Sequence, residues 1–325
     1  MTSPYSDLDR PALNESALQR ALMVGGFVSA IRVLPEVDST NTALLGAAAD
    51  GAPHGSVLVA EAQLAGKGRL GRSWQAPARS GLFLSVLVRP EHVPPARWGW
   101  LPLLAGVAAR SAVAGMAKVD VALKWPNDLI VEPDADSAGR TVPPHRPAGS
   151  GPAADSDSAT VVGAGSAPDS GAGADPGDGY DYGLGRKLGG ILVERAPGDA
   201  PAMVVGIGLN VTLRAYELPA PHATSLALAG AEVTDRDTLL RSLLRSFGTW
   251  YEDWAGASGD AEQCGLLPAY RAACATIGRE VRAQLPGGAT ISGLASSVDE
   301  QGRLVIGSAD GRENPVSAGD LIHLR

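Results

Sequence analysis

A glycine-rich segment that also carries three cations is the first place where the chain could do chemistry. Residues 63 to 74 read Gln-Leu-Ala-Gly-Lys-Gly-Arg-Leu-Gly-Arg-Ser-Trp. Glycines let backbone N–H groups approach an oxyanion, and Lys67, Arg69 and Arg72 supply charge for a phosphate or a carboxylate. The segment therefore predicts an anion cradle, with a solvated basic loop as the plainer alternative. Trp74 is either a core residue or a cover for an apolar ligand.

Three better-known nucleotide-binding motifs do not fit this chain. Residues 66–71 match G-x-G-x-x-G, but a Rossmann turn runs directly into a helix, and here the chain reaches Pro77 first. Val121-Ala122-Leu123-Lys124 imitates a kinase strand, yet the chain has no His-Arg-Asp or Asp-Phe-Gly triplet. The segment is not a P-loop either, because Gly68 follows Lys67.

Three further segments complete a pattern. They are Lys124-Trp125-Pro126-Asn127-Asp128-Leu129, Lys187-Leu188-Gly189-Gly190-Ile191-Leu192-Val193-Glu194 and Gly206-Ile207-Gly208-Leu209-Asn210-Val211. Together with the glycine-rich segment, these motifs resemble, in order, the signature set of the biotin protein ligases, also called biotin–[acetyl-CoA-carboxylase] ligases. The resemblance spans about residues 34 to 211, and the tail resembles the family's C-terminal SH3-like barrel. Each motif alone is weak, whereas four in order are specific.

The resemblance implies a two-step reaction. Biotin and ATP, with Mg²⁺, give biotinyl-5′-AMP and pyrophosphate, and a lysine of a biotin carboxyl carrier protein domain then displaces AMP. Two anions must first be brought together against their repulsion, a task for cations. Two other functions stay open: a lipoate-protein ligase, which uses the same adenylation logic, and a biotin-binding regulatory module without catalysis. A module without catalysis would be free to lose Arg69 or Lys187. Both residues are present, which favours an enzyme.

The resemblance also assigns roles to individual residues. Arg69 and Lys187 are the expected catalytic cations, holding the biotin carboxylate and the α-phosphate. The expected biotin contacts are Ser39, Thr40, Asn41, Gln63, Gly66, Lys67, Gly68, Arg69, Trp74, Lys187 and Gly190. The expected ATP contacts are Arg69, Arg72, Lys124, Trp125, Asn127 and Asn210. Asp128 is either a Mg²⁺ ligand or a turn cap, and Ser39 and Asn41 also suit plain helix capping.

Position 67 departs from the family pattern. The family often has Gly-Arg-Gly-Arg where this chain has Gly66-Lys67-Gly68-Arg69. Lysine keeps the positive charge but lacks the two-pronged guanidinium, so the backbone at this position matters more than the side chain.

Composition singles out residues 133–185 as an insert. These 53 residues hold 11 Gly, eight Asp and two Arg, for a net charge of −6. The whole chain of 325 residues carries −8, so the other 272 carry −2. With so little large apolar surface, we predict that the insert is disordered. Its flanks, residues 129–132 and 186–194, are both β-rich, which favours an enlarged hairpin loop over a linker.

The remaining pattern predicts an α+β fold of the type found in class II synthetases, with a mixed or antiparallel sheet and helices. Strands are expected at 57–61, 82–89, 119–124 and 203–211, and helices at 43–49 and 97–117. A further helix starts at Thr234 with Asp237 as a capping box, and its aromatic residues recur at core spacing. Short runs at 281–285, 290–297, 304–307 and 321–324 predict a small barrel that leans on the larger domain.

We therefore expect an N-terminal extension at 1–32, a catalytic domain at 33–275 and the barrel at 276–325. The N-terminal 32 residues are too few for a winged helix-turn-helix, so we expect no specific DNA binding. Neither a secretory signal nor an uninterrupted apolar run of membrane-spanning length is present, and Cys264 and Cys274 suit buried thiols. These features predict a cytoplasmic protein without membrane association, as a monomer or a homodimer.

Overall fold

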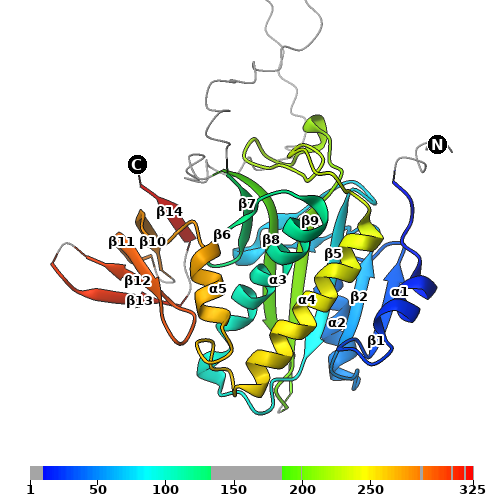
Figure 1. Cartoon of the computed structure of the whole chain (residues 1–325), viewed down its shortest axis with the longest axis horizontal. Helices are drawn as coiled ribbons and strands as arrows, with labels where there is room; N and C mark the ends of the chain where they lie inside the picture. Colours follow the sequence, from blue (N-terminus) through cyan, green and yellow to red (C-terminus); the bar gives the residue numbers. More distant parts are fainter. Residues whose placement is uncertain are drawn as a thin grey trace, which may run out of the picture.

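The computed structural model describes residues 10–132, 185–198, 200–285, 288–308, 310–317 and 320–324. Within these ranges the chain forms a large sheet layered with helices and a smaller sheet at one side (Figure 1). The predicted insert falls almost wholly on residues 133–184, outside the described residues.

A seven-stranded mixed sheet is the centre of the larger domain. Its order is β1-β2-β5-β9-β8-β7-β6, with β1 and β2 parallel and every other pair antiparallel. The strands are β1 Ala30–Leu34, β2 Ser56–Ala60, β5 Gly81–Val88, β6 Ala122–Lys124, β7 Asp128–Val131, β8 Arg186–Arg195 and β9 Met203–Asn210. The expected α+β class and mixed sheet are confirmed.

The two strands that flank the insert are neighbours in this sheet. β7 and β8 pair antiparallel, with Val131 opposite Arg186. The insert therefore joins the ends of a hairpin, as the β-rich flanks predicted.

Helices cover both faces of the large sheet. α3 (Trp100–Ala117), α4 (Arg236–Gly256) and α5 (Leu266–Ala273) lie in front of it in Figure 1. α2 (Thr40–Ala49) packs on the opposite face in a separate apolar cluster with Leu87 and Val204. Successive strand residues point to opposite faces, which is why Val86 and Val205 join the α3–α4 core instead. Short 3₁₀ turns occur at Pro95–Arg97 and Ala215–Glu217.

The most apolar helix is a core element. α3 is 18 residues long with a mean hydropathy of 1.3, which would suffice for a membrane span, but 67% of it is buried inside the protein. It ends where Lys118 adopts a left-handed conformation at φ 59°. A helix that is apolar all round is expected at such a buried position.

The aromatic residues of α4 are core residues, as their spacing predicted. Phe247, Tyr251 and Trp254 are all buried. The expected cap was misplaced by one residue, because Asp235, and not Thr234, accepts the N–H of Thr238. The helix then begins at Arg236.

The N-terminal residues belong to the same core. α1 (Glu15–Leu22) is capped by Asn14 and buries Leu18, while β1 pairs with β2 from residue 30 onward. The boundary expected at residue 33 therefore falls inside a strand. Helix α1 also covers the free edge of β1: Glu15 accepts the N–H of Val33, and Gln19 donates to the carbonyl of Ile31.

The smaller sheet has five antiparallel strands in the order β13-β12-β11-β10-β14. They are β10 Glu280–Gln284, β11 Thr290–Val298, β12 Leu304–Gly307, β13 Glu313–Val316 and β14 Asp320–His323. β13 was not predicted, since Glu-Asn-Pro-Val lacks a β-rich run. The pairings described leave β13 and β14 as edges, so the barrel is not closed by strand pairing in the described residues.

The smaller sheet shares its core with the larger domain. Val281, Ala295 and Leu304 belong to the same buried cluster as α3 and α5. The indole N–H of Trp100 on α3 donates to the carbonyl of Glu300 at 2.8 Å. The smaller sheet therefore packs against the larger domain, as expected for so small a unit.

Candidate active site

The glycine-rich segment folds as a small hairpin. β3 (Gly66–Lys67) pairs antiparallel with β4 (Ser73–Trp74), joined by a 3₁₀ turn at Arg69–Gly71. The turn needs left-handed backbone at Leu70 (φ 57°) and Gly71 (φ 77°). At Gly66 a Cβ would lie 2.4 Å from the carbonyl oxygen of Trp74, so glycine allows the strands to approach. No helix follows, which agrees with the exclusion of a Rossmann turn.

Trp74 lies across two glycines of the large sheet. A Cβ on Gly208 (β9) would be 2.8 Å from Trp74 Cε2, and one on Gly190 (β8) would be 3.3 Å from Cζ3. The indole therefore rests on a part of the sheet that has no side chains. Lys187 Nζ lies 5.8 Å from the ring centroid. The tryptophan, the hairpin and Lys187 thus meet over β8 and β9.

Two polar pairs bring the predicted cations together. Lys187 Nζ is 2.7 Å from Oδ1 of the buried Asp128, and Arg69 donates to Asn127 Oδ1 at 3.3 Å. Asn127 is held in turn by its own Nδ2, which donates to the carbonyl of Ile191 at 3.0 Å. Residues far apart in sequence are thereby placed at the β7–β8 end of the sheet.

A loop after β9 completes this end of the site. Buried Asn210 donates through Nδ2 to the carbonyl of Thr224 at 2.9 Å. The N–H of Thr224 donates to the carbonyl of Lys187, and the N–H of Lys187 donates to that of His222. The loop around residues 222–224 therefore fixes the backbone of the candidate catalytic lysine.

The predicted helix start at α2 carries a polar cluster. Ser39 is the N-cap, accepting the N–H of Thr42, so the capping alternative holds for it. Gln63 Oε1 accepts from the N–H of Thr40 at 2.9 Å and lies 3.1 Å from its hydroxyl. Asn41 is buried, and both ends of its side-chain amide are hydrogen-bonded: Nδ2 donates to Glu194 and Oδ1 accepts from Ser85.

The hairpin and the end of β8 enclose an open groove of about 410 Å³. Its lining residues are Lys67, Gly68, Arg69, Leu70, Gly71, Arg72, Leu192 and Glu194. Three cations and a carboxylate thus line the cavity together with the apolar Leu70 and Leu192, a mixture suited to a ligand that is part anionic and part apolar.

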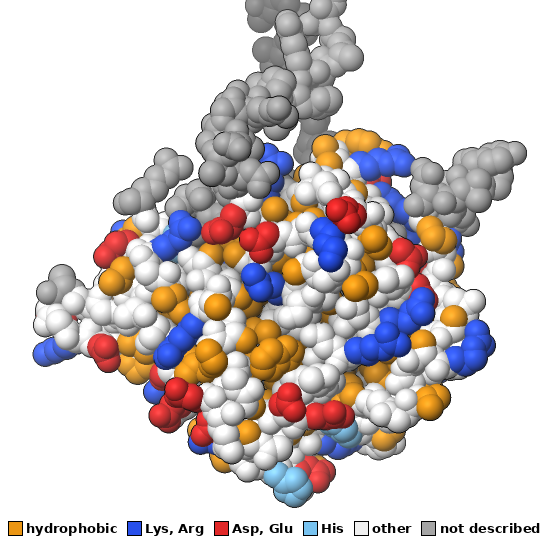
Figure 2. Space-filling view, viewed as in Figure 1, with side chains coloured by type: hydrophobic (Ala, Val, Ile, Leu, Met, Phe, Trp, Pro, Cys, Tyr) orange, Lys and Arg blue, Asp and Glu red, His pale blue; other side chains and the backbone are white. Residues whose placement is uncertain are grey.

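The other face of the molecule differs in character. Figure 2 shows the side covered by α3 and α4, where acidic and basic side chains are interspersed with apolar ones. Such a surface offers no concentrated field of one sign to an anionic substrate.

One predicted site residue is directed elsewhere. Trp125 is 1% exposed, and its indole N–H donates to the carbonyl of Gly302 in the smaller sheet's β11–β12 turn. Its backbone N–H donates to Thr276. The structure therefore gives Trp125 a role at the junction between domains and does not bring its ring to the cluster. Lys124 is buried on β6, next to the turn that presents Asn127.

Two residues of the site were not predicted. Ser85 on β5 bonds the Thr40 and Asn41 side chains, and Glu194 on β8 bonds Asn41 and lines the groove. Both had a signal in the sequence. Ser85 is the one polar residue of β5, and Glu194 shares a strand face with Gly190 and Leu192 because side chains alternate.

Comparison with known proteins decides the family. The chain is 37% identical to a biotin–[acetyl-CoA-carboxylase] ligase of Mycobacterium tuberculosis over 97% of both chains. This chain belongs to the biotin protein ligase family. Residues 33–140 match the biotin/lipoate A/B protein ligase family, and residues 276–324 match the biotin protein ligase C-terminal domain.

Other members show how far the family extends. The bifunctional ligase/repressor BirA of Escherichia coli is 29% identical over 91% of this chain and 74% of its own length. The biotin protein ligase from Aquifex aeolicus, solved in complex with biotin and ATP, aligns with a TM-score of 0.63 at 23% identity. That alignment covers 90% of this chain and 99% of the other, so the ligase fold extends over both domains.

Proposed function

We propose that this chain attaches biotin to a lysine of a biotin carboxyl carrier domain, through biotinyl-5′-AMP. The convergence of Arg69, Trp74 and Lys187 over β8 and β9, in a chain of the biotin protein ligase family, is the observation that carries the proposal. Arg69 and Trp74 come from the glycine-rich hairpin and Lys187 from β8, more than 100 residues later in the sequence, and the chemistry needs them together.

The first step joins two anions. When a biotin carboxylate oxygen attacks the α-phosphorus of ATP, the bond to pyrophosphate breaks and negative charge grows on the phosphoryl oxygens. Arg69 and Lys187 are our candidates for balancing that charge, with Arg72 on the departing pyrophosphate. Both candidates are held by side chains, Asn127 and Asp128, that keep them at the same end of the sheet.

In the second step the uncharged ε-amine of the carrier lysine attacks the acyl carbon of biotinyl-AMP. An amide bond forms, the bond to the AMP oxygen breaks, and the amine loses its proton. The AMP leaving group departs with negative charge, which the same two cations stabilise.

The polar cluster at the start of α2 and two apolar side chains suit the rest of biotin. The ureido ring presents two N–H donors and one carbonyl acceptor, which Ser39, Thr40 and Gln63 can match, while the apolar rings and chain suit Leu192 and Trp74. We propose Asn127, Asn210 and Lys124 for the adenylate side. Trp125 contributes there through the backbone of its turn.

The residues that the structure describes do not form a protein-held Mg²⁺ site. No group of three or more His, Cys, Asp or Glu side chains that could hold a metal occurs in the described ranges. Asp128, the predicted ligand, already faces the Lys187 ammonium at 2.7 Å. We therefore assign Asp128 to lysine positioning, and Mg²⁺ enters our proposal only as part of the MgATP substrate.

The test is an adenylation and transfer assay. The purified chain is incubated with MgATP and either biotin or lipoate, and pyrophosphate release is followed together with mass labelling of a carrier domain. We expect release and a single biotin adduct with biotin only. The proposal would be overturned if lipoate supported pyrophosphate release and biotin did not. It would also be overturned if neither acid supported release.

A carrier domain whose target lysine is replaced by arginine is the matched control. It should leave the first-step burst of pyrophosphate intact and abolish the adduct. An adduct on the arginine variant would mean that free biotinyl-AMP is labelling lysines at random.

A further inference from the structure

Ser85 is an unexpected polar residue in the middle of an apolar strand. It is fully buried on β5, whose other residues are Gly, Leu, Phe and Val. Its Oγ lies 2.6 Å from Asn41 Oδ1 and 2.8 Å from Thr40 Oγ1. A buried hydroxyl between two side chains of the helix that borders the biotin pocket needs a reason beyond packing.

The orientation of the Asn41 amide follows from its neighbours. On one side lie Glu194 Oε2 at 2.8 Å and the carbonyl of Leu192 at 3.2 Å, and both can only accept. The amide nitrogen must face them, which turns Oδ1 toward Ser85. Because Oδ1 carries no hydrogen, the Ser85 hydroxyl must donate to it.

This fixes the proton of the Thr40 hydroxyl in turn. The oxygens within reach of it are Ser85 Oγ, whose own proton is already used, and Gln63 Oε1 at 3.1 Å. In both cases the Thr40 hydroxyl donates its proton to another side chain of the protein. Its oxygen is therefore left to accept a hydrogen bond from a ligand. Gln63 Oε1 also accepts the N–H of Thr40, which leaves Nε2 as a donor beside Gly66.

The opposing strand is shaped to hold this arrangement. Ser85 pairs with Gly206 across β5 and β9. A Cβ on Gly206 would lie 2.2 Å from Asn41 Oδ1. Glycine at this position is therefore what allows the amide to reach the serine.

We infer that Glu194 and Ser85 are positioning residues that set the donor and acceptor polarity of the biotin head-group pocket. The inference rests on the proposed function and names the ligand chemistry it selects. A head group with an N–H beside Thr40 and a carbonyl beside Gln63 satisfies the pocket. A cyclic urea has both groups, whereas the dithiolane ring of lipoate has neither and would leave polar groups unpaired.

The test compares biotin and its two mono-N-methyl derivatives on four variants. Binding of biotin and of each mono-N-methyl biotin is measured by calorimetry without ATP, and the KM for ATP is measured separately. The variants are Ser85→Ala, Glu194→Leu, the conservative Glu194→Gln, and the matched control Ser56→Ala. Ser56 is also a buried strand serine, but its hydroxyl donates to the backbone carbonyl of Pro53.

For the wild type we expect at least one N-methyl biotin to bind about tenfold more weakly than biotin. Ser85→Ala and Glu194→Leu should weaken biotin binding about tenfold and reduce that discrimination, with the KM for ATP unchanged. Glu194→Gln keeps an acceptor for Asn41 and should retain the discrimination. Ser56→Ala should match the wild type.

Unchanged biotin affinity and unchanged discrimination in Ser85→Ala would overturn the inference. So would an equal loss for biotin and ATP, because a general structural fault predicts that result. If Glu194→Leu fails to fold, Ser85→Ala, which removes one oxygen, carries the test by itself. A wild type that does not bind biotin refutes the proposed function instead.

Discussion

Lys187 Nζ and Asp128 Oδ1 lie 2.7 Å apart across the β7–β8 pair, with the carboxylate buried and the lysine side chain 24% exposed. The ammonium is thus held at the sheet end where Arg69 bonds Asn127.

This relationship predicts unequal effects of two substitutions. Lys187→Ala should lower kcat/KM for biotin adenylation about 10²- to 10³-fold, because a charge on the transition state loses its partner. Asp128→Asn should cost less, about tenfold, since the lysine remains but is less well placed. Pyrophosphate release measures both, and the exposed Lys118→Gln is the control. Equal rates for Lys187→Ala and the wild type would remove the lysine from the mechanism.

The contact between Trp74 and Gly208 predicts a second effect. Gly208→Ala places a Cβ 2.8 Å from the indole and should displace it, weakening biotin binding about tenfold. Gly46→Ala on α2 is the matched control, because nothing lies within 4 Å of its Cβ and alanine favours the helix. Calorimetric titration with biotin reports the difference. Identical affinities would show that Trp74 does not cover the ligand.

A buried ion pair near the N-terminus predicts a loss of stability. Arg236 Nη1 lies 2.7 Å from Glu61 Oε2, both are nearly fully buried, and Arg236 also donates to the carbonyl of Pro11. Arg236→Ala leaves the carboxylate without its partner and should cost about 3–5 kcal/mol of unfolding free energy. Urea denaturation measures this cost. Arg241→Ala, which breaks a more exposed pair on the same helix, should cost under about 1 kcal/mol.

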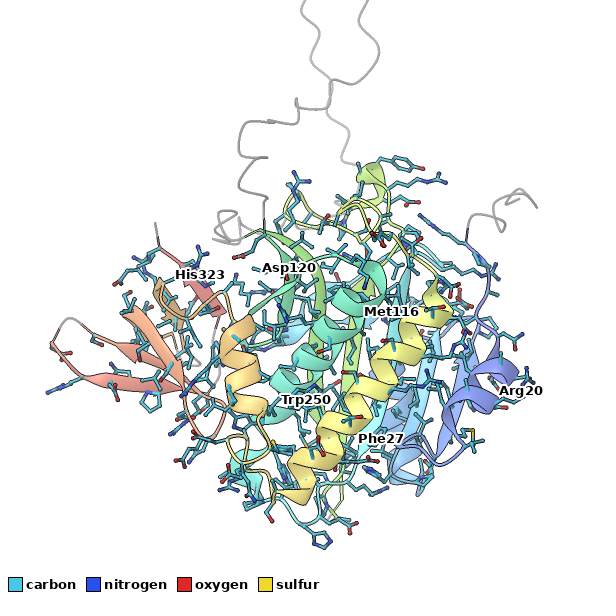
Figure 3. All side chains as sticks on the ribbon, in the orientation of Figure 1. Arg20, Phe27, Met116, Asp120, Trp250 and His323 are labelled. Atoms are coloured by element: carbon cyan, nitrogen blue, oxygen red, sulfur yellow. The ribbon has the colours of Figure 1, made fainter. Side chains whose placement is uncertain are left out.

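An aromatic cluster predicts a pH dependence of stability. His54 packs 5.1 Å from Phe27 and 5.2 Å from Tyr251 between ring centroids, and Figure 3 shows Phe27 beside α4. Burial, and then the Arg89 guanidinium, lower the pKa of His54, against a smaller opposing effect of Glu91. The folded state therefore prefers the neutral ring.

The sign of the effect follows from this lowered pKa. The contribution of His54 to stability is complete above the unfolded-state pKa of about 6.5 and is lost as the pH falls through the folded-state value. The melting temperature should therefore drop between about pH 7 and pH 5, and His54→Asn should flatten that dependence. Parallel curves for the two proteins would assign the acid sensitivity to other groups.

The sequence was most informative where a single segment sets its own structure. The i, i+3, i+4 spacing in α4 and the apolar length of α3 determine buried helices, since burying one face of a helix needs only local periodicity. The β-rich flanks of the insert likewise predicted the β7–β8 hairpin. Four short motifs in order were enough to predict the family.

What the sequence by itself determined, then, is many of the helices and strands, the family and the residue types available for chemistry. Only the tertiary structure decided that Trp125 faces the smaller sheet, that Asp128 neighbours Lys187, and that Ser85 connects Thr40 to Asn41. Each depends on the direction of a side chain across strands or domains that are distant in sequence. Local propensity does not encode such directions, because they follow from sheet order and register, which the packing of the whole chain sets.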